Sequence, residues 1–289
     1  MKSLYALLLI LLVHTPAIAN EKENNTLFIV GSTSIGKLVE VTQAPFLAQS
    51  GIKLLVRPIG SDKGVVSIAE GVSDLGIVSR YLTPKEVNKW PELSQITFGQ
   101  DAIVFLANKA SELTNLSSTQ VVNMYTNQRQ GDISLFSKGK RHGTHQSFLD
   151  FFELESMPAP LNNNKLVFKK RGINQLYGQV KAKMYNKINQ AVANISRTPN
   201  SKTFESLGAF KIYSQTGNVD NVKVLSLDGQ LPIINDKLNP KYQFKRPLNI
   251  IIASRVSVNA QQYINYLLSD SGQSLLKKHY FLPLKLTTD

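Results

Sequence analysis

Short apolar runs alternate with segments of helical spacing through the first third of the chain. Three β-rich runs stop at or near glycine or proline: residues 26–30, 52–58 and 74–78. Two segments with helical spacing lie between them: residues 37–49 and 65–70. Strands separated by helices predict a parallel α/β sheet, with ligands bound near the carboxyl ends of the strands. We expect Pro45 to bend or end the first helix.

Two later apolar runs, 102–107 and 248–253, are continuous, as is typical of strands buried on both faces. The second run is followed by a pattern that predicts two helices between residues 258 and 278, separated near 269–272. The region between the two runs has helical segments of its own and a surplus of lysine. We therefore expect the chain to pass twice between two α/β lobes. The predicted lobes are residues 24–103 with 248–289, and residues 104–247.

The N-terminus has the pattern of a signal peptide. A basic start is followed by the apolar run 7–13, which is too short to span a bilayer, and by Pro16 and the small-x-small sequence 17–19. A buried N-terminal helix is the alternative interpretation. We expect residues 1–19 to be removed and the mature protein to begin at Asn20, which makes it periplasmic or secreted.

The composition is that of a globular protein, with 42% hydrophobic and 18% charged residues. The absence of cysteine excludes disulfides, thiol catalysis, cysteine-bound zinc and a lipid-modified cysteine anchor. Lysine and arginine number 33 against 20 acidic residues, a formal charge of +13 that stays at about +12 after removal of the signal peptide. This excess favours anionic partners without identifying them.

Four loops at the ends of predicted strands are rich in glycine, serine, threonine or histidine: residues 31–34, 60–64, 78–80 and 141–145. Hydroxyls and unpaired N–H groups at a helix N-terminus form a cradle for anions. Helix capping is the ordinary explanation for any one such loop, but four of them in one α/β chain favour an anion site. The first loop also has the glycine and lysine frame of a nucleotide P-loop. Leu38 stands where that motif needs a hydroxyl for magnesium, so we reject a P-loop.

Catalytic and metal-binding patterns are sparse. His142 and His145 are three residues apart, but no nearby residue completes a metal site with correct spacing. No Ser-His-acid motif or nucleophile elbow is visible, and no pair of carboxylates is indicated. We expect a protein that is not an enzyme and that needs no cofactor or metal.

Basic residues form two clusters in the middle of the chain: Lys165, Lys169, Lys170 and Arg171, and then Lys181, Lys183 and Lys187. Such charges ordinarily make a solvated face. Nucleic-acid binding needs interleaved aromatic residues, and Tyr177 and Tyr185 offer weak support. We expect no specific nucleic-acid partner.

The order and spacing of the loops resemble those of the phosphate-binding proteins of bacterial high-affinity ABC transporters. The shared patterns are Gly-Ser-x-Thr after the first strand, Gly-Ser-x-x-Gly after the second, and Gly-x-x-Asp-Leu-Gly-x-x-Ser-Arg at the third. They correspond here to residues 31–34, 60–64 and 71–80. The family's crossover strand and the first helix of its second lobe resemble residues 107–109 and 116–125. Its C-terminal helix resembles residues 269–273, with 283–284 after them. The likeness covers most of residues 26–150 and 240–284.

The resemblance implies a type II periplasmic binding protein, an α/β fold with two lobes joined by two crossover strands and a ligand cleft between them. It also implies a monomer that binds inorganic phosphate or a related oxyanion without metal and delivers it to an ABC permease in the inner membrane. Matched by position, the expected ligand-binding residues are Thr33, Ser34, Ser61, Ser79, Arg80, Arg141, His142, Gly143 and Thr144.

The fourth loop departs from the family's Arg-x-x-Gly-Ser-Gly-Thr pattern, because Lys138, Arg141 and His142 replace its arginine, first glycine and serine. An arginine fork holds two oxygens of an oxyanion, whereas lysine is a point charge. We predict that Arg141 supplies the missing fork and that His142 helps increasingly below about pH 6.5. The third loop has no evident carboxylate to accept a phosphate proton, so the choice between phosphate and sulfate stays open.

Two alternative functions remain open at this point. The altered fourth loop and the positive charge fit an extracellular binder of anionic polymers that uses the same fold with a degenerate phosphate site. An enzyme acting on phosphate esters is the least favoured, because it needs a nucleophile and base, or a set of metal ligands.

Overall fold

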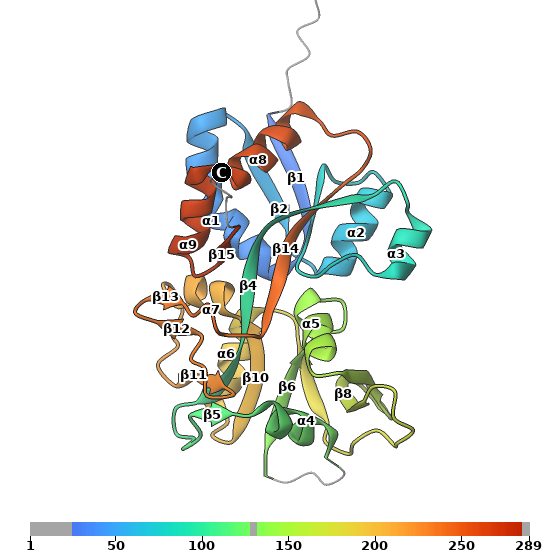
Figure 1. Ribbon diagram of the computed structural model, residues 1–289, viewed down its shortest axis with the longest axis vertical. Coiled ribbons are helices and arrows are strands. Elements are labelled where there is room, and N and C mark those ends of the chain that lie inside the picture. The colour runs from blue at the N-terminus through green and yellow to red at the C-terminus, as the bar shows by residue number, and fades with distance from the viewer. Residues whose placement is uncertain (1–24, 128–131, 285–289) are drawn as a thin grey trace, which may run out of the picture.

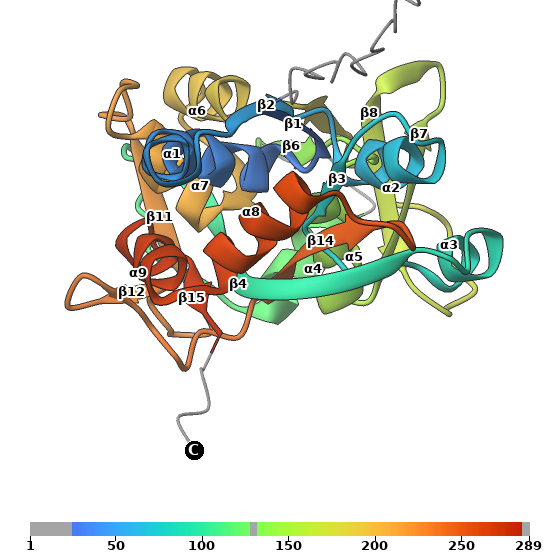
Figure 2. The ribbon, with the colours of Figure 1, turned by 90° about the horizontal axis from the view of Figure 1, so that it is seen from above.

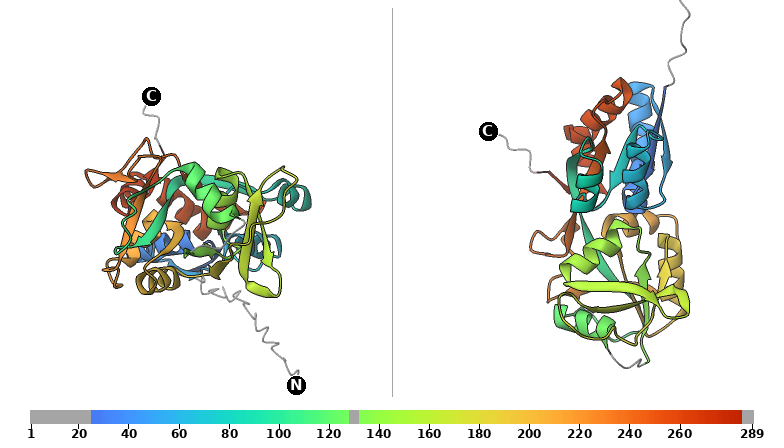
Figure 3. Two further views of the ribbon diagram at one scale, coloured as in Figure 1. Left: turned by 90° about the horizontal axis from the view of Figure 1, so that it is seen from below. Right: turned by 90° about the vertical axis from the view of Figure 1, so that its right-hand side faces the viewer.

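The computed structural model describes residues 25–127 and 132–284, and the predicted signal peptide lies outside them. Figure 1 shows two α/β halves, one above the other, which we call the upper and lower halves. The side view in Figure 3 shows the same two halves stacked along the long axis. No helix in the described ranges is long and apolar enough to span a membrane.

The upper half is built from both ends of the described chain. Its N-terminal elements are β1 (Thr26–Gly31), α1 (Thr33–Ser50), β2 (Lys53–Arg57), α2 (Ser61–Ala69), β3 (Leu75–Val78) and α3 (Pro84–Lys89). Its C-terminal elements are β14 (Lys245–Ile252), α8 (Val258–Leu268), α9 (Asp270–Lys278) and β15 (Leu282–Pro283). The predicted break between two C-terminal helices is confirmed, because Ser269 ends α8 and caps α9.

The lower half comes from the middle of the chain and is reached through the long strand β4 (Ser94–Asn108). Its helices are α4 (Ser118–Thr126), α5 (Gly143–Phe151), α6 (Ile188–Arg197) and α7 (Leu207–Tyr213). Its longer strands are β6 (Ser134–Lys138), β7 (Leu154–Ala159), β8 (Asn162–Lys170), β9 (Ala182–Tyr185), β10 (Ser201–Ser206) and β11 (Val222–Leu227). Its two-residue strands are β5 (Asn115–Leu116), β12 (Ile233–Ile234) and β13 (Lys237–Leu238).

Hydrogen bonding continues from one half to the other through β4. The upper strands follow the order β2-β1-β3-β14-β4, and the lower strands continue as β10-β6-β9-β8-β7. The upper part of β4 pairs with β14, whereas its lower part pairs with β10 and β11. The expectation of a parallel sheet is confirmed for β1, β2 and β3. It is corrected for β14 and β4, which run antiparallel to their neighbours because each connects the two halves.

The strands of the upper half bury side chains on both faces, because successive residues of a strand point in opposite directions. Ile77 and Ile250 pack against the group that contains α1, α8 and α9. Val78 and Ile251, the next residues along, pack with α2 on the other side. Figure 2 shows these helix groups on opposite sides of the curved sheet.

The lower half has an aromatic core. Phe148 of α5 and Phe204 of β10 stack with ring centroids 4.0 Å apart, and Phe105 of β4 meets both rings edge-on. This core draws on residues 102–244, whereas the larger upper core draws on 27–98 and 248–281, with Ile212 of α7 added. On this basis we propose that the division into lobes falls close to the predicted boundaries, between residues 98 and 102 and between residues 244 and 248.

Pro45 does not end the first helix, so that part of the prediction is wrong. Helix α1 begins at Thr33 and continues through Pro45 to Ser50, where Gly51 ends it in the left-handed conformation. Proline removes one backbone hydrogen bond. Packing stabilises the last turn in compensation, since the ring of Phe46 contacts Tyr263 at 4.9 Å and Tyr266 at 5.2 Å between centroids.

The aromatic core gives a stability prediction. Replacing Phe204, which is fully buried, by alanine leaves a cavity beside Phe148, so we expect Phe204→Ala to lower the free energy of unfolding by about 3–5 kcal/mol. Urea unfolding followed by circular dichroism measures the change. The control is Leu231→Ala in the same half, where the side chain is 54% exposed and the expected change is within about 0.5 kcal/mol. Equal effects of the two substitutions would contradict the prediction.

Candidate functional site

Three helices begin at the junction between the halves. Helices α1 and α2 start at Thr33 and Ser61 of the upper half, and α5 starts at Gly143 of the lower half. The first N–H groups of a helix have no acceptor within the helix, and its dipole favours negative charge there. Three of the four predicted loops thus come together as helix N-termini.

A buried arginine stands at the centre of this junction. Arg246, on crossover strand β14, lies directly opposite Asp101 on β4. Its Nη2 and Nε donate to Oδ2 of Asp101 at 2.7 and 3.1 Å, and the two side chains are 1% and 0% exposed. Burying a charge pair away from water costs several kcal/mol, so further hydrogen bonds to the guanidinium are needed to offset that cost.

The other donor positions of Arg246 reach hydroxyls from both halves. Its Nη2 donates to Ser34 Oγ at 2.8 Å, and its Nη1 donates to Ser79 Oγ at 3.1 Å and to Thr144 Oγ1 at 2.6 Å. All three hydroxyl residues are 1% exposed. One guanidinium therefore connects a carboxylate, two upper-half serines and a lower-half threonine in a single cluster.

Ser61 connects the halves a second time. Its Oγ accepts from the N–H groups of Ser79 and Gly143, each at 3.2 Å, so it joins α2 to the start of α5. Gly143 must be glycine for this approach, since a Cβ there would lie 2.6 Å from Ser79 Oγ and 2.8 Å from Ser61 Oγ. Nearby, the N–H of Asp62 donates to the carbonyl of Arg141 at 3.3 Å.

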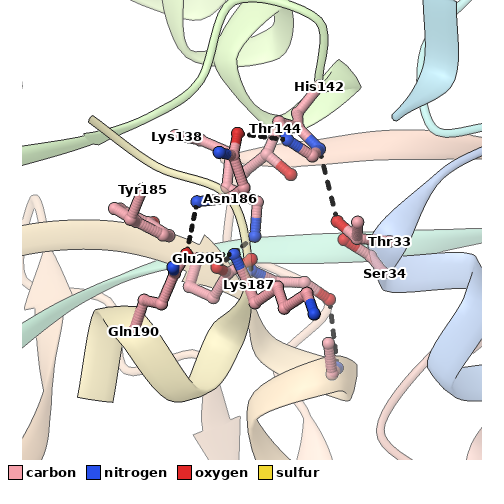
Figure 4. A network of polar contacts seen from close by, with 12 residues as sticks. Thr33, Ser34, Lys138, His142, Thr144, Tyr185, Asn186, Lys187, Gln190 and Glu205 are labelled. Atoms are coloured by element: carbon pink, nitrogen blue, oxygen red, sulfur yellow. Dashed lines mark hydrogen bonds and ion pairs between the residues drawn. The ribbon is translucent and has the colours of Figure 1, made fainter. Parts of the chain in front are cut away.

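A third connection runs through His142. Figure 4 shows its ring between Thr33 of the upper half and the lower-half segment that carries Asn186. Its Nε2 lies 3.1 Å from the Asn186 Oδ1 acceptor, and its Nδ1 lies 3.4 Å from Thr33 Oγ1. Assigned from this network, Nε2 carries the proton and donates to Asn186, and Nδ1 accepts from the threonine hydroxyl.

The expected protonation of His142 near pH 6.5 is corrected by its surroundings. Burial, together with the nearby positive charge of Lys138, lowers the pKa of His142 to about 3. His142 therefore stays neutral throughout the physiological pH range, which suits its role as an acceptor for Thr33. Burial likewise lowers the pKa of His145 to about 3.

A second buried ion pair lies beside the cluster. Nζ of Lys138, at the end of β6, donates to Oε2 of Glu205 at 2.6 Å, and both side chains are 1% exposed. Oε1 of the same carboxylate accepts from the N–H of Ser206, and the ring of Tyr185 lies 5.0 Å from Nζ. Figure 4 shows this pair facing Thr33 and Ser34 across the gap between the halves.

A cavity of about 300 Å³ opens next to these groups. The upper half contributes residues of α1 together with Pro58, and the lower half contributes the two members of the buried pair and residues of α6 and α7. The lining is Thr33, Ser34, Lys37, Glu40, Pro58, Lys138, Lys187, Ile188, Asn189, Glu205, Ala209 and Tyr213.

The side chains of the two arginines predicted to contact the ligand lie outside the buried cluster around Arg246. Arg80 donates to Glu86 at 2.7 and 2.8 Å and to Asp62 at 2.8 Å, an arrangement that stabilises the start of α3. Arg141 is exposed, and its guanidinium makes no ion pair within the described ranges. The buried guanidinium at the junction belongs to Arg246, whereas Arg141, which the sequence favoured as the arginine of the anion site, is exposed. The remaining predicted residues lie at the junction: Thr33, Ser34, Ser61, Ser79, His142, Gly143 and Thr144.

Sequence reasoning missed Arg246, Asp101 and Glu205. Two of them carried a signal, because Asp101 and Arg246 are opposite charges that border the two apolar crossover runs. Antiparallel pairing of those runs brings the charges together. Glu205 lies in β10, a strand that the sequence did not predict, so its pairing with Lys138 could not be seen from the local pattern.

The histidine pair does not form a metal site. His145 contacts Ser137 Oγ through Nδ1 at 3.2 Å and Ser156 Oγ through Nε2 at 2.9 Å, whereas His142 points to Thr33 and Asn186. Among the residues that the structure describes, no group of three histidine, aspartate or glutamate side chains could hold a metal ion.

Two lobes, two crossover strands and a polar site between them define the class of type II periplasmic binding proteins. A model of the PBP superfamily domain matches residues 17–271, and the chain belongs to that superfamily. A crystal structure from Clostridium perfringens, of a protein assigned as a phosphate ABC transporter substrate-binding protein with bound phosphate, has the same fold. Its TM-score is 0.73 at 20% identity, over 90% of this chain and 100% of that one.

Two proteins that are named for phosphate binding are similar to this chain in sequence. The phosphate-binding protein PstS 2 of Streptococcus agalactiae is 26% identical over 156 residues, which cover 54% of this chain and about half (47%) of that relative. The phosphate-binding protein PstS of Borreliella burgdorferi is 20% identical over 96% of this chain and 98% of its own length.

The buried pair of Lys138 and Glu205 gives a second stability prediction. We expect Glu205→Gln to lower the free energy of unfolding by about 3–5 kcal/mol, because it leaves the ammonium group of Lys138 buried without a counter-charge. The double variant Lys138→Met/Glu205→Gln should recover most of that loss, since no buried charge is left. A double-mutant cycle from urea unfolding measures both effects. Additive losses would contradict a coupled pair.

The buried histidines give a pH prediction. Their folded pKa values of about 3 lie below the unfolded value near 6.5, so the stability that they contribute is present above pH 6.5 and is lost as pH falls toward 3. Each can contribute a slope of up to about 1.4 kcal/mol per pH unit. We expect His145→Gln to flatten the decline in unfolding free energy measured between pH 7 and 5. Parallel curves for the variant and the wild type would contradict this.

Proposed function

We propose that the protein binds inorganic phosphate, or a closely related oxyanion, between its two halves. The buried cluster of Ser34, Ser79 and Thr144 around the guanidinium of Arg246 carries this proposal. Hydroxyls from both halves meet there beside three helix N-termini, which is the arrangement that an enclosed anion requires. The phosphate-binding relatives from Streptococcus agalactiae and Borreliella burgdorferi support phosphate as the anion.

The hydrogen-bonding directions suit an anionic ligand. Ser34 and Thr144 accept through oxygen from Arg246, so each hydroxyl hydrogen is available to donate toward the cavity side. Thr33 uses its own hydroxyl to donate to His142 and therefore contributes its backbone N–H. The ammonium group of Lys138, paired with Glu205, lines the same cavity.

The transport role is part of the proposal. In this role the protein is exported, closes its two lobes on the anion as a monomer and presents the closed shape to an ABC permease. The relatives that are named as phosphate-binding proteins support a binding protein over an enzyme acting on phosphate esters. Binding of anionic polymers is the competing outcome, and it would show a steep dependence on salt.

The hydroxyl of Thr144 provides a direct test. A hydrogen bond to a charged ligand contributes about 1.5–3 kcal/mol, so Thr144→Val should weaken phosphate binding about tenfold or more. Isothermal titration calorimetry of the purified protein measures the dissociation constant. Thr126→Val, at the far end of α4, removes a hydroxyl bonded only to the carbonyl of Val122 and should leave binding unchanged. Unchanged binding in both variants would remove Thr144 from the site.

The source of the positive charge is tested by two arginine variants. We expect Arg246→Lys to weaken phosphate binding at least tenfold, because lysine cannot hold Ser34, Ser79 and Thr144 at once. Arg141→Met should change it less than threefold at about 0.15 M salt, since exposed charges are screened. The opposite order would return the role to Arg141, and no phosphate binding by the wild type would overturn the proposed function.

A further inference from the structure

One face of the sheet in the lower half takes no part in the proposed anion site. In the described ranges β7 is the last strand of that sheet, and it pairs with β8, which pairs with β9. Figure 1 shows β8 on the right-hand side of the lower half. Leu166 and Phe168 of β8 are buried in the aromatic core, where α4 and α5 pack on β8 and β7. Because side chains alternate along a strand, Lys165, Val167 and Lys169 point to the opposite face, which we call the outward face.

The outward face carries a groove with largely apolar walls. Met157 of β7 lies opposite Val167 of β8 in the strand register, so the two side chains share this face. The segment before β9 runs back along β8, since the N–H of Gly178 donates to the carbonyl of Phe168 at 2.7 Å. The groove is lined by Met157, Pro160, Val167, Leu176, Tyr177, Gly178, Gln179 and Lys181.

Two leucines project beside this groove. Leu161 lies in the turn between β7 and β8, directly after the lining residue Pro160, and its side chain is fully exposed. Leu176, which is itself part of the lining, is 82% exposed. Single exposed leucines are ordinary on protein surfaces, but exposed apolar side chains that gather around a groove mark a surface for interaction.

Lysines lie on the same outward face. Lys165 of β8 is opposite Lys183 of β9, and Lys181, two residues before Lys183, lines the groove. These three lysines make no ion pair within the described ranges. Glu155, opposite Lys169 in the register, is paired with that lysine at 3.4 Å. Three positive charges without a carboxylate partner therefore stand next to the apolar groove, and they favour a negatively charged partner.

The residue types of this face favour a lipid surface over a protein partner. Protein interfaces are enriched in arginine and depleted in lysine, whereas all the cations named on this face are lysines. Exposed leucines can enter the boundary between headgroups and acyl chains of a bilayer, while the long stems of lysines lie along it and carry their charges to the lipid phosphates. A soluble anionic polymer would bind the lysines through charge but would gain little from an exposed leucine.

From these observations we infer that the outward face of β7, β8 and β9 binds the surface of a membrane that contains anionic lipids. Leu161 and Leu176 enter the interface, and the three lysines contact lipid phosphates. The inference does not depend on the proposed function, because none of these residues lines the cavity between the halves.

Cosedimentation with vesicles tests the inference. The wild-type protein is mixed with vesicles of phosphatidylcholine, either alone or with an equal amount of phosphatidylglycerol. We expect binding to the mixed vesicles to be about tenfold tighter or more, since each lysine near an anionic surface adds to the affinity. No binding to either kind of vesicle, or equal binding to both, overturns the inference and leaves phosphate binding untouched.

A pair of double variants separates this face from the overall charge of the protein. Lys181→Gln/Lys183→Gln removes two charges of the outward face, each worth about fivefold, so binding to the mixed vesicles should weaken about tenfold or more. Lys277→Gln/Lys278→Gln removes two exposed charges at the end of α9 in the upper half and is the matched control. It should change binding less than about twofold. Equal losses in the two double variants overturn the inference in favour of general charge attraction.

Leu161 distinguishes a bilayer from a soluble polyanion. Its φ is +60°, a conformation that asparagine adopts readily, so Leu161→Asn removes the apolar side chain without straining the turn. We expect this variant to bind the mixed vesicles about fivefold more weakly or less tightly still, because burial of the leucine is lost. Leu231→Asn, at another exposed leucine of the lower half, is the control and should leave vesicle binding unchanged. Unchanged vesicle binding by Leu161→Asn, or tighter binding of the wild type to soluble polyphosphate than to the vesicles, overturns the inference in favour of an anionic polymer.

Discussion

The arrangement of the site depends on the buried pair of Arg246 and Asp101. These residues sit opposite each other on β14 and β4, the two strands that connect the halves. Asp101 fixes one edge of the guanidinium, and the other donors then reach Ser34 and Thr144 from opposite halves. A hydrophobic pair in the same place would be as stable, but it could not orient hydroxyls from two lobes toward one point.

The contacts between the halves are polar at the buried cluster, whereas away from it Ile212 of α7 packs into the apolar core of the upper half. The links are single hydrogen bonds, such as Ser61 to Gly143 and Thr33 to His142, together with the guanidinium cluster. Separating such links costs less than opening a packed core, because water replaces the lost partners. This division of interactions suits two rigid bodies that close on a ligand, with β4 and β14 as the connection.

Local patterns in the sequence predicted much of the fold, and for a physical reason. The strands, loops and helices of residues 26–78 follow one another in sequence, so periodicity and turn residues are enough to predict them. The hydroxyls of Ser34 and Ser61 were correctly placed at helix starts. The prediction failed where pairing is distant. Arg246 and Asp101 are 145 residues apart, and Lys138 and Glu205 are 67 apart. Arg141 was favoured because it is close to Thr144 in sequence, whereas burial and strand register select Arg246.

The buried charges of the site balance before any ligand enters, since Arg246 is paired with Asp101 and Lys138 with Glu205. The large positive charge of the chain therefore lies elsewhere, much of it on exposed lysines that are screened by salt. An anion at this site gains from oriented hydroxyls, helix N-termini and an already fixed guanidinium rather than from an unpaired cation. Under the proposed function, recognition depends on the positions of hydrogen-bond donors rather than on excess positive charge.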